Sequence, residues 1–273
     1  MFHFLKALPA SVALILGVAT LMAQEPPPAP GLLNPDLAMM QSTFRITGPG
    51  KKSKETITGT GFLVRVPEPS GGTEFVAVTA AHVLRDIPGN TATFLLQVPE
   101  PGGGYQRVVL SMTIRKDGRR VWTEPEGVDI AVMSVPLSKT GVQGIPFAAL
   151  ATDQDMQRGL SLNVGDPVHV LGYPFGYEFN DFPVMRSAAI ASYPLAPASV
   201  VKRLVVDFTS VGGDSGGPVY TARASFKVLG IVTLQILSPD HAQNTGLTFV
   251  IPAEFIREAI GLLPKTANPV ATP

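Results

Sequence analysis

The sequence predicts an all-β protein that ends in one α-helix. Short apolar or alternating runs dominate from about residue 40 onward, and 27 glycines and 26 prolines punctuate the 273 residues. A sheet with so many strands must close or fold over to protect its edges, which favours a barrel or a sandwich. The one extended helical pattern lies near the end of the chain.

Each strand candidate is an apolar or alternating run bounded by turn residues. These runs cover residues 42–47, 55–66, 74–79, 91–98, 105–115, 130–135, 167–172, 184–192, 203–208, 218–220, 227–235 and 248–251. In the final pattern Pro252 occupies a first-turn position, an acid follows, and apolar residues recur at helical spacing up to Leu263. We therefore expect a C-terminal helix over residues 252–263 that packs on the sheet.

The N-terminus has the pattern of a secretory signal. Lys6 precedes an apolar run that ends in small residues at Ala23, so we expect cleavage after residues 1–23 and export to the bacterial periplasm or the medium. The alternative, an uncleaved membrane anchor, is disfavoured by Pro9 and by an apolar segment shorter than the roughly 20 residues of a membrane span. Residues 24–40 are expected to be a Pro-rich disordered spacer, and residues 264–273 a disordered tail.

The charge balance excludes some partners. Lys and Arg together number 21, as do Asp and Glu, so no net field recruits nucleic acid or an anionic membrane. We expect no nucleic-acid partner and no integral membrane segment after signal cleavage. The chain has no cysteine, so its stability must come from the core without disulfides. No cluster of ligands calls for a metal or cofactor, and no feature predicts an oligomeric state.

Residues 211–220, VGGDSGGPVY, surround Ser215 with four glycines and then continue into β-forming residues. A hydroxyl attacks an acyl carbon when a base takes its proton and donors stabilise the resulting oxyanion. The backbone amides of Gly213 and Ser215 can be those donors, because glycine permits the backbone angles that such a loop needs. The loop therefore indicates an acyl-transfer nucleophile, although a Gly-rich turn alone carries little weight.

A base and an orienting acid can be named among the remaining residues. His82 follows small residues at the end of a buried strand, whereas the other histidines lie in the signal, in a strand and in a polar loop (His3, His169 and His241). Asp129 heads an apolar strand, and an acid there can hold the imidazole in one tautomer and stabilise the imidazolium. His82, Asp129 and Ser215 are therefore the expected catalytic residues.

The order of these three residues and their motifs resembles the chymotrypsin-like, or trypsin-like, serine peptidases. The matching motifs are T-A-A-H at residues 79–82, D-I-A at 129–131 and G-D-S-G-G-P at 213–218. Residues 59–62, 172–176 and 246–252 are most similar to the bacterial high-temperature-requirement branch. The resemblance spans roughly residues 40–262, and no PDZ domain is expected after Leu263.

The resemblance implies two perpendicular six-stranded β-barrels with the catalytic residues in the cleft between them. It places a peptidase domain at residues 41–263, with barrels at about 41–135 and 160–252 and the helix at 252–263. The implied function is that of a serine endopeptidase acting on protein or peptide substrates. The amides of Gly213 and Ser215 would form its oxyanion hole.

Asp214 departs from the high-temperature-requirement branch, which usually has Asn at this position. In zymogen-activated relatives such an acid pairs with a new N-terminus, and a cut after Arg45 would release Ile46. Residues 42–47 already have a strand pattern, so we expect Asp214 to find a local hydrogen-bond partner instead.

The resemblance also places the primary specificity pocket. Thr209 would lie at its base, with Thr233, Leu234 and Gln235 as one wall and residues 246–249 opposite. A threonine base offers no buried anion to Lys or Arg, so we expect a small or medium apolar residue before the cut.

Two other classes of function fit parts of the sequence. Residues 213–217 match G-x-S-x-G, the nucleophile elbow of α/β-hydrolases, but that fold needs a helix after the serine and the order Ser, acid, His. The second alternative is a catalytically latent protein that uses the cleft to bind peptides or proteins. The presence of a nucleophile, a base and an acid together favours catalysis.

Overall fold

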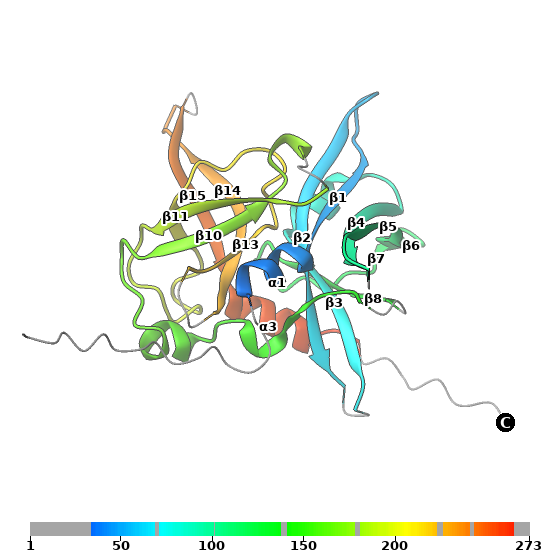
Figure 1. The fold of residues 1–273 in the computed structure, drawn as a ribbon. Helices are drawn as coiled ribbons and strands as arrows, with labels where there is room; N and C mark the ends of the chain where they lie inside the picture. Colours follow the sequence, from blue (N-terminus) through cyan, green and yellow to red (C-terminus); the bar gives the residue numbers. More distant parts are fainter. Residues whose placement is uncertain are drawn as a thin grey trace, which may run out of the picture.

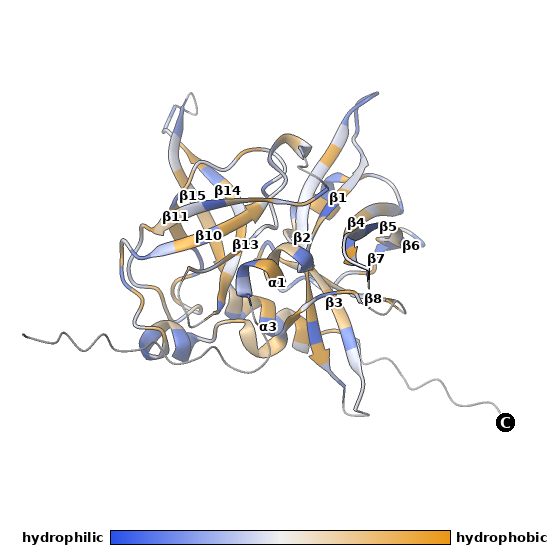
Figure 2. Cartoon of the chain, in the orientation of Figure 1, coloured by the Kyte–Doolittle hydropathy of each residue, from blue (hydrophilic) through white to orange (hydrophobic). Residues whose placement is uncertain are grey.

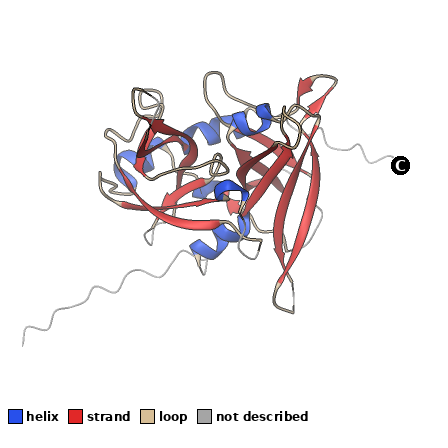
Figure 3. Ribbon diagram, turned by 90° about the horizontal axis from the view of Figure 1, so that it is seen from above, coloured by secondary structure: helices blue, strands red, loops and turns tan. Residues whose placement is uncertain are grey.

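The computed structural model describes residues 34–68, 71–100, 102–137, 141–177, 181–222, 226–240 and 243–264. The expected signal lies outside these residues, as do most of the expected spacer and tail. None of the described helices is long and apolar enough to cross a membrane. The described chain is mostly β and forms two groups of strands, which lie beside each other in Figure 1 and, from above, in Figure 3.

The N-terminal group is a seven-stranded sheet in the order β5-β4-β1-β2-β3-β8, with β9 parallel to β2. Its strands are β1 (Thr43–Pro49), β2 (Thr56–Pro67), β3 (Thr73–Thr79), β4 (Thr91–Pro99), β5 (Tyr105–Thr113), β8 (Ala131–Val135) and β9 (Ile145–Pro146). The expectation of a closed six-stranded barrel here was wrong, because β5 and β8 form no ladder within the described sheet. The chain between them instead makes the small hairpin β6 (Arg115–Lys116) and β7 (Arg119–Arg120), and only an isolated bridge from Thr123 reaches β8.

The C-terminal group is a closed six-stranded barrel with the strand order β10-β11-β12-β15-β14-β13. Its strands are β10 (Pro167–Gly172), β11 (Val184–Ile190), β12 (Leu204–Asp207), β13 (Pro218–Thr221), β14 (Val228–Leu237) and β15 (Asn244–Pro252). Antiparallel pairing closes the ring where β10 meets β13. Closure removes the exposed strand edges, as expected for a sheet of this size.

Short helices lie before, between and after the strands. They are α1 (Pro35–Ser42), α2 (Ala81–Asp86), η1 (Phe147–Ala149), η2 (Asp155–Gly159), η3 (Pro174–Gly176) and α3 (Ala253–Gly261). The buried residues of α3 recur at helical spacing, and the helix contacts β8 as well as β14 and β15. Helix α3 therefore joins the sheet to the barrel (Figure 1).

Helix α1 corrects the prediction that the disordered spacer extends to residue 40. The Asn34 side chain caps the helix by accepting a hydrogen bond from the Leu37 amide, and Pro35 fits its first turn. Met39 is fully buried, and Asp36 contacts His169 and Tyr220 of the barrel. These tertiary contacts order the segment.

Hydrophobic residues of the strands form the core of both groups. In β2 the central residues are buried, and Figure 2 shows hydrophilic residues at the far end of the β1–β2 hairpin. Phe44 and Phe94 stack with ring centroids 4.9 Å apart between β1 and β4. The turns that follow β3 and precede β13 carry the candidate site.

Candidate active site

The pairing of β3 with β8 brings His82 next to Asp129. Thr79 at the end of β3 pairs with Ala131 at the start of β8, so α2 begins beside the residues that precede β8. The Ala81 amide donates to the Asp129 carbonyl at 3.4 Å and ties the two segments together. Strand register thus places a histidine and an acid 47 residues apart in sequence within bonding distance.

The Asp129 carboxylate holds His82 at two points. Its Oδ2 lies 2.6 Å from the imidazole Nδ1, and its Oδ1 accepts the His82 backbone amide at 2.9 Å. Burial raises the pKa of Asp129, but the hydrogen bonds and charge of His82 and the charge of Arg85 outweigh it and hold the pKa below its ordinary value. An ionised Asp129 fixes the imidazole with Nδ1 protonated and leaves Nε2 to act as a base.

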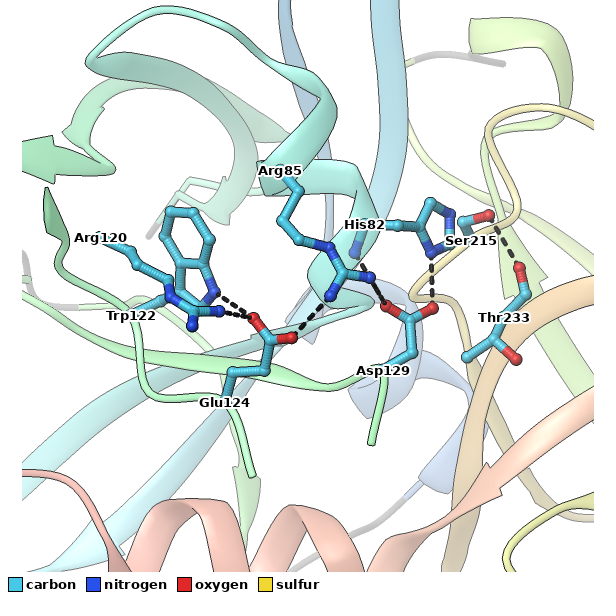
Figure 4. A network of polar contacts seen from close by, with 8 residues as sticks. All are labelled: His82, Arg85, Arg120, Trp122, Glu124, Asp129, Ser215 and Thr233. Atoms are coloured by element: carbon cyan, nitrogen blue, oxygen red, sulfur yellow. Dashed lines mark hydrogen bonds and ion pairs between the residues drawn. The ribbon is translucent and has the colours of Figure 1, made fainter. Parts of the chain in front are cut away.

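An arginine that sequence reasoning did not identify also binds Asp129, the candidate acid. Arg85 donates from Nη2 to Asp129 Oδ1 at 3.0 Å and from Nη1 to Glu124 Oε1 at 2.7 Å, as Figure 4 shows. It lies three residues after His82 on α2, so both side chains share one face of the helix. Its spacing of three residues after the candidate base was the feature of the sequence from which Arg85 could have been found.

Ser215 lies in the turn before β13, not at the start of a helix. Its Oγ donates to the Thr233 carbonyl at 3.2 Å (Figure 4). Thr233 lies where the register of β14 against β15 shifts, between Val232 and Gln235. A strand follows the serine, so the α/β-hydrolase alternative was wrong; its downstream His241 lies outside the described residues.

The serine turn packs directly against the segment that carries His82. A Cβ added at Gly216 would lie 2.1 Å from the Thr60 carbonyl and 2.8 Å from the Ala80 amide nitrogen. Gly216 has φ +86° and Gly213 has φ +99°. Glycine is therefore needed at these positions because the protein's own backbone approaches closely, in addition to the backbone freedom expected from the sequence.

The amides of Gly213 and Ser215 have no hydrogen-bond acceptor within the described parts of the chain. Their neighbours are satisfied, since the Asp214 amide donates to Val211 and the Gly216 amide donates to Val232. Free amides in a closed turn are suited to bind an oxyanion.

Thr60 is a second residue that sequence reasoning missed. It is fully buried, and its hydroxyl donates to the Gly213 carbonyl at 2.7 Å and accepts the Tyr173 amide at 3.1 Å. Its own amide donates to the Ser215 carbonyl at 2.8 Å. One residue of β2 therefore positions both ends of the serine turn, through contacts that span about 150 residues.

Asp214 has the local partner expected from the sequence and a distant partner that was not foreseen. Its buried carboxylate accepts the Val211 amide at 2.8 Å and also binds the Arg186 guanidinium from β11. Arg186 lies over the Phe208 ring, 4.5 Å from its centroid. Burial raises the pKa of Asp214, and the Val211 amide and the Arg186 charge oppose this shift. Arg45, at the hypothetical cleavage point, lies inside β1.

Three of the expected pocket residues, Thr233, Leu234 and Gln235, lie at the β14 irregularity, and Thr209 lies in the segment between β12 and β13. Thr209, Leu234 and Gln235 are exposed, while Thr233 is buried. The Thr209 hydroxyl lies 3.8 Å from where a Cβ would stand on Gly246. A separate cavity of about 230 Å³ contains Thr233 and Leu234 but not Thr209 or Gln235; its other lining residues are Gly127, Val128, Asp129, Lys202, Arg203 and Ile251.

The chain belongs to the trypsin-like peptidase domain family, whose pattern matches residues 59–231. The resemblance identified from the sequence is therefore confirmed. No curated protein matches the chain.

Solved structures of bacterial proteases share the fold. The serine endoprotease from Yersinia pestis superimposes with a TM-score of 0.52 at 16% identity, over 84% of this chain and 66% of that one. The active form of the Rv3671c protease from M. tuberculosis gives a TM-score of 0.51 at 21% identity, over 88% of this chain and 89% of that one. The chain thus spans about two thirds of the Yersinia protein's length.

Proposed function

We propose that this protein is an exported serine endopeptidase that cleaves peptide bonds through an acyl-enzyme intermediate. The observation that carries the proposal is the 2.6 Å contact between His82 Nδ1 and Asp129 Oδ2, beside a turn whose Gly213 and Ser215 amides are free. Membership of the trypsin-like peptidase family supports the same reaction.

Each residue has a defined role in the proposed reaction. Ser215 Oγ attacks the peptide carbonyl while His82 Nε2 takes its proton, and Asp129 stabilises the imidazolium that forms. The amides of Gly213 and Ser215 stabilise the oxyanion. His82 then returns the proton to the leaving amine, and water attacks the acyl-enzyme by the same route. For the first step the Ser215 hydroxyl must exchange the Thr233 carbonyl for His82 as its acceptor.

Labelling with a fluorophosphonate tests the activated nucleophile. We expect the probe to modify Ser215 in the full chain, and we expect the adduct to be lost in Ser215→Ala and in His82→Ala. Peptide mass spectrometry locates the adduct, and circular dichroism shows whether each variant is folded. A folded wild-type chain that remains unlabelled over the neutral pH range would refute the proposed activity.

Substrate profiling tests the specificity part of the proposal. With Thr209 at the pocket base, we expect peptides with Ala, Val or Leu before the cut to be cleaved at least about tenfold faster than peptides with Lys or Arg. Thr209→Asp adds an anion and should move the preference toward Lys and Arg. An unchanged profile in that folded variant would show that Thr209 does not line the pocket.

A latent peptide-binding protein is the second candidate, and the bond from Ser215 to Thr233 favours it. Such a protein would bind peptides with equal affinity before and after Ser215→Ala and would not react with the probe.

Export is the part of the proposal that rests on the N-terminal sequence alone. N-terminal sequencing of chain recovered outside producing cells tests it, and Gln24 is the expected first residue.

A further inference from the structure

The guanidinium of Arg85 lies between two carboxylates next to the proposed base. Its Nη2 is 3.0 Å from Asp129 Oδ1 and its Nη1 is 2.7 Å from Glu124 Oε1. A planar guanidinium that binds an acid on each side has little freedom to rotate. The Asp129 carboxylate is therefore fixed by Arg85 as well as by His82 (Figure 4).

Glu124 is itself anchored on the side away from Arg85. Its Oε2 accepts Arg120 Nη1 at 2.6 Å and Trp122 Nε1 at 3.1 Å. The Glu124 side chain is only 11% exposed, compared with 46% for Arg85. The less exposed acid thus holds the more exposed arginine against Asp129, because three donors fix the position of the Glu124 carboxylate.

The charges of Arg85 and Glu124 have opposite effects on the proposed base, His82. The positive charge of Arg85 opposes formation of the His82 imidazolium, and the negative charge of Glu124 offsets that effect. Other charged residues on the surrounding segments are Arg120, which binds Glu124, Asp86 on α2, Glu126 between Glu124 and Asp129, and Lys202 and Arg203, which line the cavity beside Asp129. Besides Asp129, Glu124 is the acid that bonds to Arg85, so it is placed to balance the arginine charge.

We propose that Arg85 is a positioning residue for the catalytic acid and that Arg85 and Glu124 together set the pH above which the enzyme is active. This inference rests on the proposed peptidase function. It predicts that two substitutions in one hydrogen-bonded pair will move the acidic limb of the pH profile in opposite directions.

The test is the pH dependence of kcat/KM for the full chain and its variants. Arg85→Gln removes a cation beside the proposed base, so the acidic limb of the profile should move to higher pH by about half a pH unit. Glu124→Gln removes an anion, so the acidic limb should move to lower pH by a smaller amount. Arg85→Lys keeps the charge and should hold the limb near its original position, although kcat falls with KM unchanged because the two-sided contact is lost.

Arg120→Gln is the matched control, because Arg120 binds Glu124 but does not contact Asp129. Its acidic limb should move less than that of Arg85→Gln. A purely structural role for the pair would lower activity in both variants without opposed shifts, so limbs that move together or stay in place would overturn the inference. If the wild-type chain neither cleaves peptides nor reacts with the fluorophosphonate, the proposed peptidase function itself is wrong. That result differs from an active enzyme whose variants show no opposed shifts, which would overturn only the inference about Arg85 and Glu124.

Discussion

Replacing Arg186 by methionine should lower the free energy of unfolding by about 3 kcal/mol and reduce kcat/KM by roughly 100-fold. Methionine keeps much of the side-chain volume over Phe208 but leaves the fully buried Asp214 carboxylate without its cation. Asp214 precedes the proposed nucleophile, so a carboxylate that moves or takes up a proton should displace the Gly213 and Ser215 amides. Urea unfolding and peptide hydrolysis measure the two effects.

Two further variants separate the loss of the ion pair from general damage. Asp214→Asn combined with Arg186→Met removes both charges, and Asn can still accept the Val211 amide, so the double variant should regain at least half of the lost stability. Arg158→Met removes an exposed arginine from the same half of the chain and should change stability by less than about 0.5 kcal/mol. If Arg186→Met unfolds at the wild-type urea concentration, the ion pair does not support the serine turn.

Gly213→Ala should reduce kcat/KM by about 100-fold to 1,000-fold and destabilise the fold by more than about 2 kcal/mol. The added Cβ would lie 2.0 Å from the Tyr173 carbonyl, and the φ of +99° disfavours any residue with a side chain. The turn must therefore move, and one proposed oxyanion donor moves with it. Hydrolysis of a peptide ester and thermal unfolding measure the outcome.

The adjacent Gly212 supplies a matched control. A Cβ at Gly212 meets no atom within 4 Å, and its φ lies outside the positive range, so Gly212→Ala should stay close to the wild type in stability. Gly212→Ala and Gly213→Ala make the same chemical change, of the same size, in the same loop. Equal losses in the two variants, or none in either, would refute the role given to the Gly213 backbone.

The strands and the order of the candidate catalytic motifs were predictable because they depend on local patterns. The runs at residues 55–66 and 167–172 agree with β2 and β10 to within one residue, and the apolar spacing at residues 252–263 predicted α3. The motifs around His82, Asp129 and Ser215 could be found for the same reason, since each is a short run whose chemistry depends on residue type.

Contacts between distant residues could not be read from those patterns. Thr60 reaches Gly213 across 153 residues, and Arg186 reaches Asp214 across 28. The sheet fails to close because the chain after β5 turns into a separate hairpin, which strand propensity does not specify.

By itself, the sequence determined the class of fold and the candidate residues for acyl transfer, because hydrophobic period, turn residues and side-chain chemistry are local properties. Only the tertiary structure decided how those residues are supported. Helix α1 is ordered by barrel residues more than 130 positions away, and Asp129 is bound by an arginine whose second partner comes from another segment. The physical reason is that burial and ion pairing act between groups brought together by the whole fold, and a short stretch of sequence contains only one side of each contact.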